Sequence, residues 1–186
     1  TPSRVYRFNL SNKSKELVKE QEIPSGHNPE NYIVERVEFQ SHDGRLVPLT
    51  ITRHKKTKID GSANLLLYGY GSYGSSMSPS FSSTRLSLID RDIIWATAHI
   101  RGGMEKGMKW WKEGKLTNKK NTFEDYIHAG KYLIENNYTS KGKIIGMGGS
   151  AGGLLMGAVV NQSPELFLGI IMAVPFVDSL TTNLDH

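Results

Sequence analysis

The sequence predicts an α/β fold built on a mainly parallel sheet. Four short and mostly apolar runs, of the length of strands, lie at residues 64–68, 93–98, 143–147 and 169–174. Strands of parallel sheets that are buried on both faces have this composition. Helical patterns lie between the later runs, and buried strands that alternate with helices are typical of α/β proteins. In such sheets the functional side chains follow the carboxyl ends of strands, so we expect a site there.

Length and composition fit a globular protein. The 186 residues are 38% hydrophobic and 22% charged, and a chain of this size can bury about 70% of its unfolded surface. The absence of cysteine excludes a disulfide scaffold, a thiolate metal site and a cysteine nucleophile, and it fits a cytoplasmic protein. The longest apolar run, residues 166–177, is too short to span a bilayer. We expect no metal, no cofactor and no membrane partner.

The basic balance does not indicate nucleic-acid binding. The net charge of +5 comes from lysines that are mixed with acids along the chain. The densest basic cluster, His54–Lys58, contains no aromatic residue and stands where a loop is expected. It is therefore interpreted as a solvated loop, the alternative being a weak contact with an anion.

The N-terminal part is predicted to form a β-hairpin that is followed by a domain boundary. Residues 5–10 alternate apolar and polar side chains, which predicts a half-buried strand. Residues 12–14 form a turn signal, and residues 17–23 are the candidate partner strand. The turn-rich stretch 24–29 is a candidate domain boundary.

Two further strands and two helices are predicted downstream. Residues 33–39 and 46–52 are joined at Asp43-Gly44, a strong hairpin signal. A helix up to Asn137 is predicted from apolar side chains at helical spacing, and Thr122–Asp125 resembles a capping box at its start. A second helix, rich in small residues, is expected over 151–160.

The strongest chemical signal is a Gly-x-Ser-x-Gly motif, Gly148–Gly152, after the third apolar run. A sharp strand-to-helix turn places the serine in a strained backbone conformation, which glycine neighbours permit. Ser150 would then expose its hydroxyl, and the N–H of Ala151 at the helix start could stabilise an oxyanion. The alternative is a glycine-rich helix start with Ser150 as a capping residue.

Two glycine patterns also resemble dinucleotide-binding motifs. Residues 69–74 fit Gly-x-Gly-x-x-Gly, but the Ser/Pro stretch 75–83 that follows is not expected to begin a helix that could hold a pyrophosphate. Residues 146–151 fit the looser form that ends in alanine, and Glu165 lies at a suitable distance for a ribose. This second pattern remains an alternative interpretation, whereas no phosphate-binding loop with Gly-Lys-Ser/Thr occurs.

The ordered motifs together resemble the prolyl oligopeptidase family of serine peptidases, over nearly the whole chain. Ala151 after the serine and the run Pro175–Asp178 point to its oligopeptidase B (protease II) branch. The motifs are Tyr68–Gly74, His99–Gly103, Lys119–Phe123, Gly148–Gly153, Asn161–Phe167 and Val174–Asp178.

This resemblance implies roles for several residues. Ser150 matches the nucleophile, and Tyr70 matches the tyrosine whose hydroxyl completes the oxyanion site with the Ala151 N–H. Tyr73 and Phe176 match positions near the specificity pocket, although packing in the core is an equal alternative for both. For Tyr70 the alternative is likewise a packing aromatic side chain.

Two further residues of the motifs are expected to be structural. Arg101 is interpreted as holding loops together through its fork of donors. His99 precedes the serine, whereas the triad of this fold runs serine, acid, histidine, so His99 is expected to be a packed histidine.

The resemblance also implies that the chain is a fragment. A β-propeller precedes the catalytic domain in the family. Residues 1–28 would be a remnant of it, and residues 29–186 would be the N-terminal half of the hydrolase domain. The expected architecture is a partial α/β-hydrolase fold without its C-terminal strands. Asp178 and Asp185 come too early to be the family's triad acid, and His186 is the terminal residue, so neither triad partner is expected in this chain.

The expected function is that of a fragment of a serine oligopeptidase that cleaves short peptides after basic residues through an acyl-enzyme. Without triad partners the chain alone is expected to be inactive. The alternatives are an esterase of the same fold and a non-catalytic remnant or interaction module.

Hydroxyls at Ser78 and Ser80 stand where oligopeptidase B proteins carry acids, which argues against a dibasic preference. The incomplete sheet would expose an edge, which predicts self-association or a complementing chain.

Overall fold

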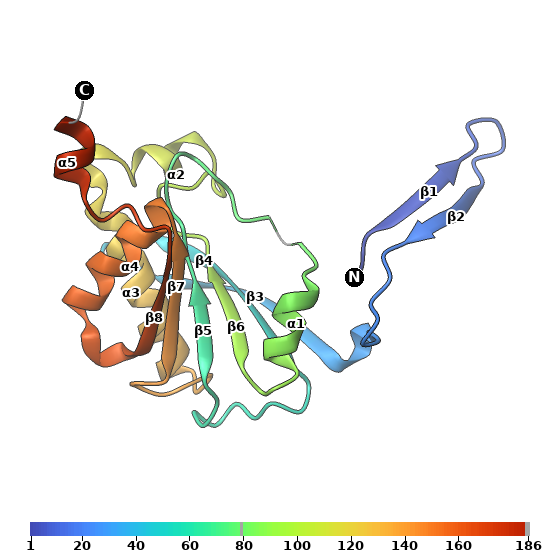
Figure 1. Cartoon of the computed structure of the whole chain (residues 1–186), viewed down its shortest axis with the longest axis horizontal. Coiled ribbons are helices and arrows are strands. Elements are labelled where there is room, and N and C mark those ends of the chain that lie inside the picture. Colours follow the sequence, from blue (N-terminus) through green and yellow to red (C-terminus); the bar gives the residue numbers. More distant parts are fainter. Residues whose placement is uncertain (79, 185–186) are drawn as a thin grey trace.

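A six-stranded mixed sheet forms the centre of the structure, a computed structural model that describes residues 1–78 and 80–184 (Figure 1). The strand order is β3-β4-β6-β5-β7-β8, with β6, β5, β7 and β8 parallel and β4 antiparallel to both its neighbours. The predicted α/β class and the mainly parallel sheet are therefore confirmed. The strands are β3 (Tyr32–Gln40), β4 (Leu46–His54), β5 (Leu65–Tyr68), β6 (Ile94–Ala98), β7 (Ile144–Gly149) and β8 (Phe167–Ala173).

Helices cover both faces of this sheet. Helices α3 and α4 pack together on one face, and α1 packs on β6 and β4 from the other face (Figure 1). Alternation along β6 explains the two layers, because Trp95 points to α1 whereas Ile94 and Ala96 belong to the core on the other side. The helices are α1 (Ser83–Ile89), α2 (Met108–Lys112), α3 (Lys120–Glu135), α4 (Ala151–Gln162) and α5 (Ser179–Leu184). The sequence patterns did not predict α1, α2 or α5, which are too short to show a helical period.

The N-terminal hairpin forms a separate two-stranded sheet of β1 (Arg4–Phe8) and β2 (Lys15–Glu20). It projects away from the central sheet (Figure 1). The predicted turn is confirmed, with Lys13 at φ 56°. Most of its apolar side chains are exposed, including Val5 and Phe8. Since a two-stranded hairpin alone is marginally stable, this segment has little stabilisation of its own.

The buried face of α3 follows the predicted spacing. Tyr126, Ala129, Gly130 and Leu133 are all buried against the sheet. The Tyr126 hydroxyl donates to the Leu67 carbonyl oxygen at 2.6 Å, which satisfies the buried phenol. This helix is therefore fixed to β5 by a hydrogen bond as well as by packing.

The predicted capping box at Thr122–Asp125 is wrong. Helix α3 begins at Lys120, and Thr122 lies buried inside its first turns. The Thr122 hydroxyl donates to the carbonyl oxygens of Arg101 (2.8 Å) and Gly114 (3.2 Å). The residue types that suit a local cap serve long-range contacts here, because the helix start is packed against two loops.

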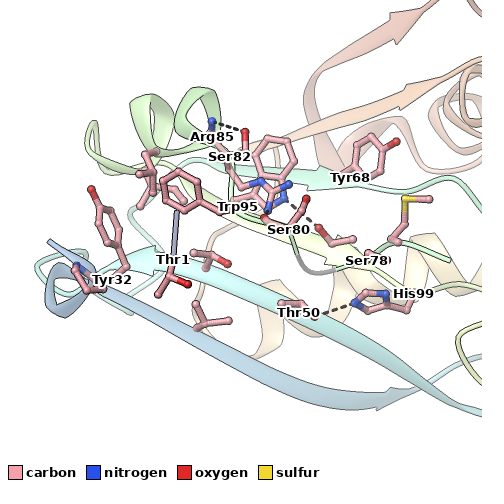
Figure 2. Close-up of a pocket in the computed structure, with 18 of the residues that line it drawn as sticks. Thr1, Tyr32, Thr50, Tyr68, Ser78, Ser80, Ser82, Arg85, Trp95 and His99 are labelled. Atoms are coloured by element: carbon pink, nitrogen blue, oxygen red, sulfur yellow. Dashed lines mark hydrogen bonds between the residues drawn. The ribbon is translucent and has the colours of Figure 1, made fainter. Parts of the chain in front are cut away.

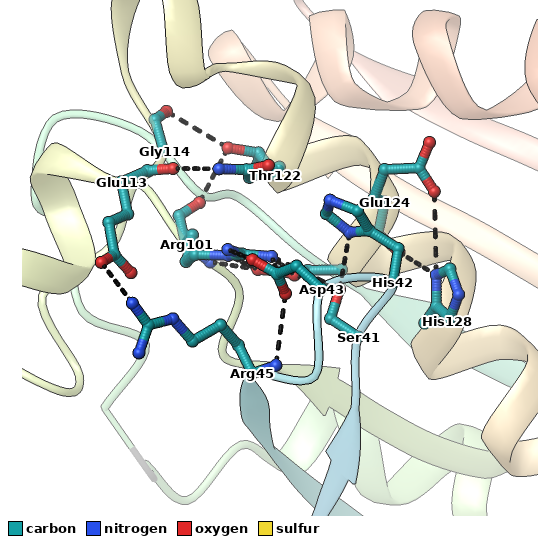
Figure 3. Close-up of polar contacts among 12 residues, drawn as sticks. Ser41, His42, Asp43, Arg45, Arg101, Glu113, Gly114, Thr122, Glu124 and His128 are labelled. Carbon is teal, nitrogen blue, oxygen red and sulfur yellow. Dashed lines mark hydrogen bonds and ion pairs between the residues drawn. The ribbon is translucent and has the colours of Figure 1, made fainter.

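Asp125 forms a buried ion pair with Arg101, whose other polar contacts are drawn in Figure 3. The side chains are 0% and 1% exposed, and Arg101 Nη2 and Nε lie 2.6 and 2.9 Å from the two carboxylate oxygens. Arg101 also binds Asp43 of the β3–β4 turn, and Ser41 donates to Asp125 at 2.6 Å. The predicted structural role of Arg101 is confirmed, since one guanidinium joins a turn, a strand end and a helix.

The prediction that the fourth apolar run is buried on both faces is wrong. Strand β8 is the edge of the sheet and pairs only with β7 among the described residues. Leu168, Ile171 and Met172 are 59%, 45% and 44% exposed. Apolar composition alone does not bury a strand, which needs a neighbour beyond it and helices on both faces. Asp185 and His186 lie outside the described residues.

Among the helices of residues 1–78 and 80–184, none combines the length and the apolar character needed to cross a membrane.

We predict that Asp125→Ala lowers the free energy of unfolding by about 3–5 kcal/mol, because it leaves a buried guanidinium without its main partner. The matched control is Glu16→Ala, which breaks the exposed pair with Arg7 and should cost at most about 1 kcal/mol. Urea denaturation of both variants measures the difference. Equal losses would contradict the central role of the buried pair.

Candidate active site

Ser150 stands at the turn between β7 and α4 in a strained conformation. Its backbone has φ 53° and ψ −117°, and its side chain is exposed. Non-glycine residues rarely adopt positive φ, and such strain persists only where the surroundings enforce it. The predicted strand-to-helix elbow is therefore present, with the serine at its apex.

Glycines allow this elbow to close. A Cβ on Gly148 would collide with the Gly152 carbonyl one turn later. A Cβ on Gly153 would lie 2.5 Å from Pro175 Cα. The elbow thus requires glycine on both sides of Ser150, which explains these glycines without a bound dinucleotide.

The segment after β8 packs directly on the elbow. The Ser150 N–H donates to the Ala173 carbonyl at 2.9 Å, and the Phe176 N–H donates to the Ser150 carbonyl at 3.0 Å. Two backbone bonds therefore fix the serine between β8 and the chain that follows. The same bonds place half-buried Phe176 beside the candidate nucleophile.

Tyr70 lies beside the first turn of α4. A Cβ on Gly152 would come within 3.3 Å of Tyr70 Cδ2 and 3.6 Å of its Cα. The first N–H groups of a helix have no acceptor within it, so the Ala151 N–H is available near the same place. Ser150, Ala151 and Tyr70, all three predicted as catalytic, are therefore gathered at one point of the structure.

Tyr73 lies in the same loop as Tyr70, residues 69–74, which we call the Tyr70 loop. Tyr73 has φ 56°, and its side chain is 79% exposed. This exposure excludes packing in the core as its role within the described structure. Phe176 is half-buried, and its backbone contact with Ser150 keeps it near the candidate site.

Among the described residues, no histidine is hydrogen-bonded to the Ser150 hydroxyl. His99 is 3% exposed, with Nε2 2.8 Å from the Thr50 hydroxyl, so the prediction of a packed histidine is confirmed. His42, His54 and His128 bond to neighbours near in sequence, and both ring nitrogens of His27 are buried and unpartnered. Asp178 accepts from the Thr181 N–H at the start of α5.

Two charged residues, one at the Tyr70 loop and one at the segment that follows it, were assigned no role from the sequence. Lys119 donates from Nζ to the Gly71 carbonyl at 2.6 Å and to the Ser72 hydroxyl at 2.8 Å. Glu105 accepts from the Met77 N–H at 2.9 Å. Burial opposes ionisation of Glu105, but the nearby His99, whose Nδ1 lies 3.6 Å from a carboxylate oxygen, and the hydrogen bond from the Met77 N–H outweigh it and lower its pKa. Only the folded loop reveals these contacts, since both partners are distant in sequence.

A cavity of about 770 Å³ lies between α1 and the sheet (Figure 2). Arg85 covers Trp95 there, with the guanidinium carbon 4.7 Å from the ring centroid. Ser150 and Tyr70 do not line this cavity, so it is separate from the candidate active site. Lining residues include Tyr32, Thr50, Tyr68, Ser78, Ser80, Arg85, Trp95 and His99.

Comparison with known proteins gives a consistent result. The family model described as "Prolyl oligopeptidase family" matches residues 79–186. The chain is 47% identical over 186 residues to dipeptidyl aminopeptidase BI of Pseudoxanthomonas mexicana and 43% identical over 185 residues to protease 2 of Moraxella lacunata. Each match covers 100% of this chain but only 26% and 27% of the relative. The chain thus spans about a quarter of the length of these relatives.

Solved structures show the same likeness in three dimensions. Oligopeptidase B from Leishmania major superposes with a TM-score of 0.92 at 42% identity, covering 100% of this chain and 26% of that one. Oligopeptidase B from Trypanosoma brucei, in its closed form with covalently bound antipain, gives 0.92 at 38% identity. That match covers 100% of this chain and 26% of the other.

We predict that Ser150→Gly is more stable than Ser150→Ala by about 1 kcal/mol, because backbone strain of about 1–3 kcal/mol is relieved and only part is lost to chain entropy. Ser163 at the end of α4 is the matched control. Its φ is −146°, so glycine there should be less stable than alanine. Urea denaturation of the four variants checks the reversal, and the same order at both positions would refute the strain.

Proposed function

This chain belongs to the prolyl oligopeptidase family, and from that premise we propose that it carries the nucleophile and the oxyanion site of a serine peptidase. The observation that carries the proposal is the strained elbow at Ser150, held between β8 and α4. Strain of this kind is costly and is kept where function requires it. Tyr70 and Ala151 lie at the same elbow, as the proposed roles require.

The proposed chemistry is acyl transfer. Ser150 Oγ attacks the peptide carbonyl carbon, and the carbonyl oxygen becomes an oxyanion held by the Ala151 N–H and the Tyr70 hydroxyl. Collapse of the intermediate breaks the C–N bond, the amine leaves with a proton, and water then hydrolyses the acyl-serine. The serine proton must pass to a base, and the described histidines bond elsewhere or lie unpartnered. We therefore propose that this chain alone does not cleave peptides at a useful rate.

Specificity after basic residues is proposed from the resemblance of Ala151 and Pro175–Asp178 to the oligopeptidase B branch. Tyr73 and Phe176 are proposed to border the pocket for the side chain before the cleaved bond. A dibasic preference is not proposed, because Ser78 and Ser80 offer hydroxyls and no charge; Pro79 lies outside the described residues.

A second specificity is favoured by the identity of 47% to a protein named dipeptidyl aminopeptidase. The two candidates differ in whether a free amino terminus is needed. Arginyl amides with a blocked terminus, compared with dipeptidyl amides with a free one, separate them in the complete protein.

We propose that residues 1–28 are a remnant of a propeller domain and that residues 29–186 are the first half of the hydrolase domain. The separate sheet of β1 and β2 in Figure 1 supports this division. We also propose a cytoplasmic location, with which the cysteine-free sequence is compatible.

Edge strand β8 is proposed to pair with β8 of a second copy of this chain. Its outer backbone groups have no strand beside them among the described residues, and Leu168, Ile171 and Met172 add exposed apolar surface. Antiparallel pairing of two identical edges is self-complementary and closes as a dimer. A complementing second chain would occupy the same edge.

We predict that the chain self-associates with rising concentration and that Ile171→Lys abolishes this, because a charge on an edge strand opposes edge pairing. Val34→Lys on the opposite edge, β3, is the matched control and should leave association unchanged. Sedimentation equilibrium measures both. A strictly monomeric wild-type chain, or association that survives Ile171→Lys, would contradict the proposed interface.

We predict that a fluorophosphonate probe labels Ser150 slowly, because an oxyanion site without a base still accelerates attack by about 10³–10⁴ over water. Ser150→Ala should abolish labelling, and Tyr70→Phe should slow it by about 10²–10³. Tyr132→Phe on α3 is the control for loss of a hydroxyl. Labelling is followed by mass spectrometry, alongside hydrolysis of an arginyl amide, which should not be detectable.

Other results of the labelling and hydrolysis assays would favour one of the alternative functions. Complete silence of the probe would favour a non-catalytic remnant or interaction module. Robust amide cleavage that Ser150→Ala removes would overturn the proposed inactivity. Turnover of esters without amides, in the complete protein, would favour the esterase.

A further inference from the structure

We propose that Lys119 is a positioning residue that holds the Tyr70 loop so that the Tyr70 hydroxyl meets the oxyanion. This inference rests on the proposed function, because it assigns a support to the proposed oxyanion donor. Lys119 would not touch the substrate.

The Tyr70 loop, residues 69–74, needs an external support. Gly71, Tyr73 and Gly74 have φ of 66°, 56° and 67°, so three of its residues are in the left-handed region. Such a backbone does not form the repeating hydrogen bonds of a helix or strand. Its position depends on what surrounds it.

Helix α3 and the residue before it support the loop at Gly71 and Ser72. Lys119 Nζ donates to the Gly71 carbonyl at 2.6 Å and to the Ser72 hydroxyl at 2.8 Å. Gly71 packs so closely on Thr122 that a Cβ would collide with the threonine methyl. One ammonium group thus binds the peptide unit between Gly71 and Ser72, one residue beyond Tyr70.

The ammonium is poorly solvated and has few other partners. Burial lowers the pKa of Lys119 to about 8, so the group is mostly protonated at neutral pH. Ser72 is buried as well, at 9% exposure. Hydrogen bonds from a charged donor to buried acceptors are stronger than neutral ones, and removing the donor leaves the Gly71 carbonyl unsatisfied.

The other backbone hydrogen bonds of the loop lie at its two ends, although Gly102 also packs against the Gly71 carbonyl oxygen, and the Gly69 N–H donates to the Met147 carbonyl at 3.2 Å. Gly74 donates to the Gly102 carbonyl at 2.9 Å, at the far end from Tyr70. Gly152 of α4 limits the Tyr70 ring on one side. Lys119 is therefore the side chain that hydrogen-bonds the peptide unit between Gly71 and Ser72, while Gly152 of α4 packs against the Tyr70 ring.

A double-mutant cycle tests whether Lys119 acts through Tyr70. Lys119→Met should slow fluorophosphonate labelling of Ser150 by at least about 10-fold, up to the 10²–10³ expected for loss of one oxyanion donor. In a Tyr70→Phe background the same substitution should have almost no further effect, since the donor is already absent. Lys120→Met, at the exposed neighbouring lysine, is the matched control.

Chemical rescue separates the ammonium from the bulk of the side chain. The sequence has no cysteine, so Lys119→Cys introduces a single thiol. Alkylation with 2-bromoethylamine restores a side chain of lysine length that ends in an ammonium, whereas 1-bromopropane gives an uncharged one of equal length. Only the aminoethyl product should recover the labelling rate.

Amide hydrogen exchange gives a readout that does not need activity. Exchange in residues 70–75 should accelerate in Lys119→Met and not in Lys120→Met, with helix α4 unchanged in both. Unchanged exchange in this loop would overturn the inference, as would additive effects in the cycle or equal rescue by both alkyl groups. Absence of labelling in the wild-type chain would instead contradict the proposed function, while the exchange result still decides the role of Lys119.

Discussion

The buried ion pair between Arg101 and Asp125 is the contact on which the geometry of the site depends. It joins the end of β6 to α3, and Asp43 attaches the β3–β4 turn to the same guanidinium (Figure 3). Burial opposes ionisation of Asp43, but its hydrogen bonds from Arg101 outweigh burial and lower its pKa. A fully buried guanidinium that loses a partner is strongly destabilising. The strand end, the turn and the helix are therefore held in one position relative to each other. The backbone that follows Arg101 is therefore fixed.

That fixed backbone leads directly to the candidate site. Gly102 lies so close to the Gly71 carbonyl that a Cβ on Gly102 would collide with it. The backbone that follows Arg101 therefore limits the position of the Tyr70 loop. A comparable approach joins Gly148 to Gly152 at the elbow. Close contacts between backbones thus help to place Ser150 and Tyr70. The glycines of the motifs serve this purpose, and the strain at Ser150 is the cost.

The sequence predicted what depends on local pattern. Alternation and apolar runs identified every strand of the sheet to within a few residues, and the glycines around Ser150 identified the elbow. It failed where a residue has a distant partner. Thr122 and Asp125 resemble a cap in the chain, yet in the fold they bind Arg101. Strand β8 has the composition of a buried strand, but burial requires neighbours that its own residues do not specify. Lys119 belonged to a recognised motif without a role, because its acceptors lie 47 and 48 residues away.

The proposed acyl transfer has two requirements that the structure separates, the placement of Ser150 and its activation. Ser150 and the proposed oxyanion donors are placed by β7, α4, the Tyr70 loop and the segment after β8, through hydrogen bonds such as those from Ser150 to Ala173 and from Phe176 to Ser150. Activation of the serine needs a base, which none of these contacts involves. Because the placing contacts lie within the described residues, the elbow does not need a base in order to keep its shape. The proposed oxyanion site can thus be arranged before a base that would activate Ser150 is brought to it, so the stability of the elbow and the proposed activity can be measured independently.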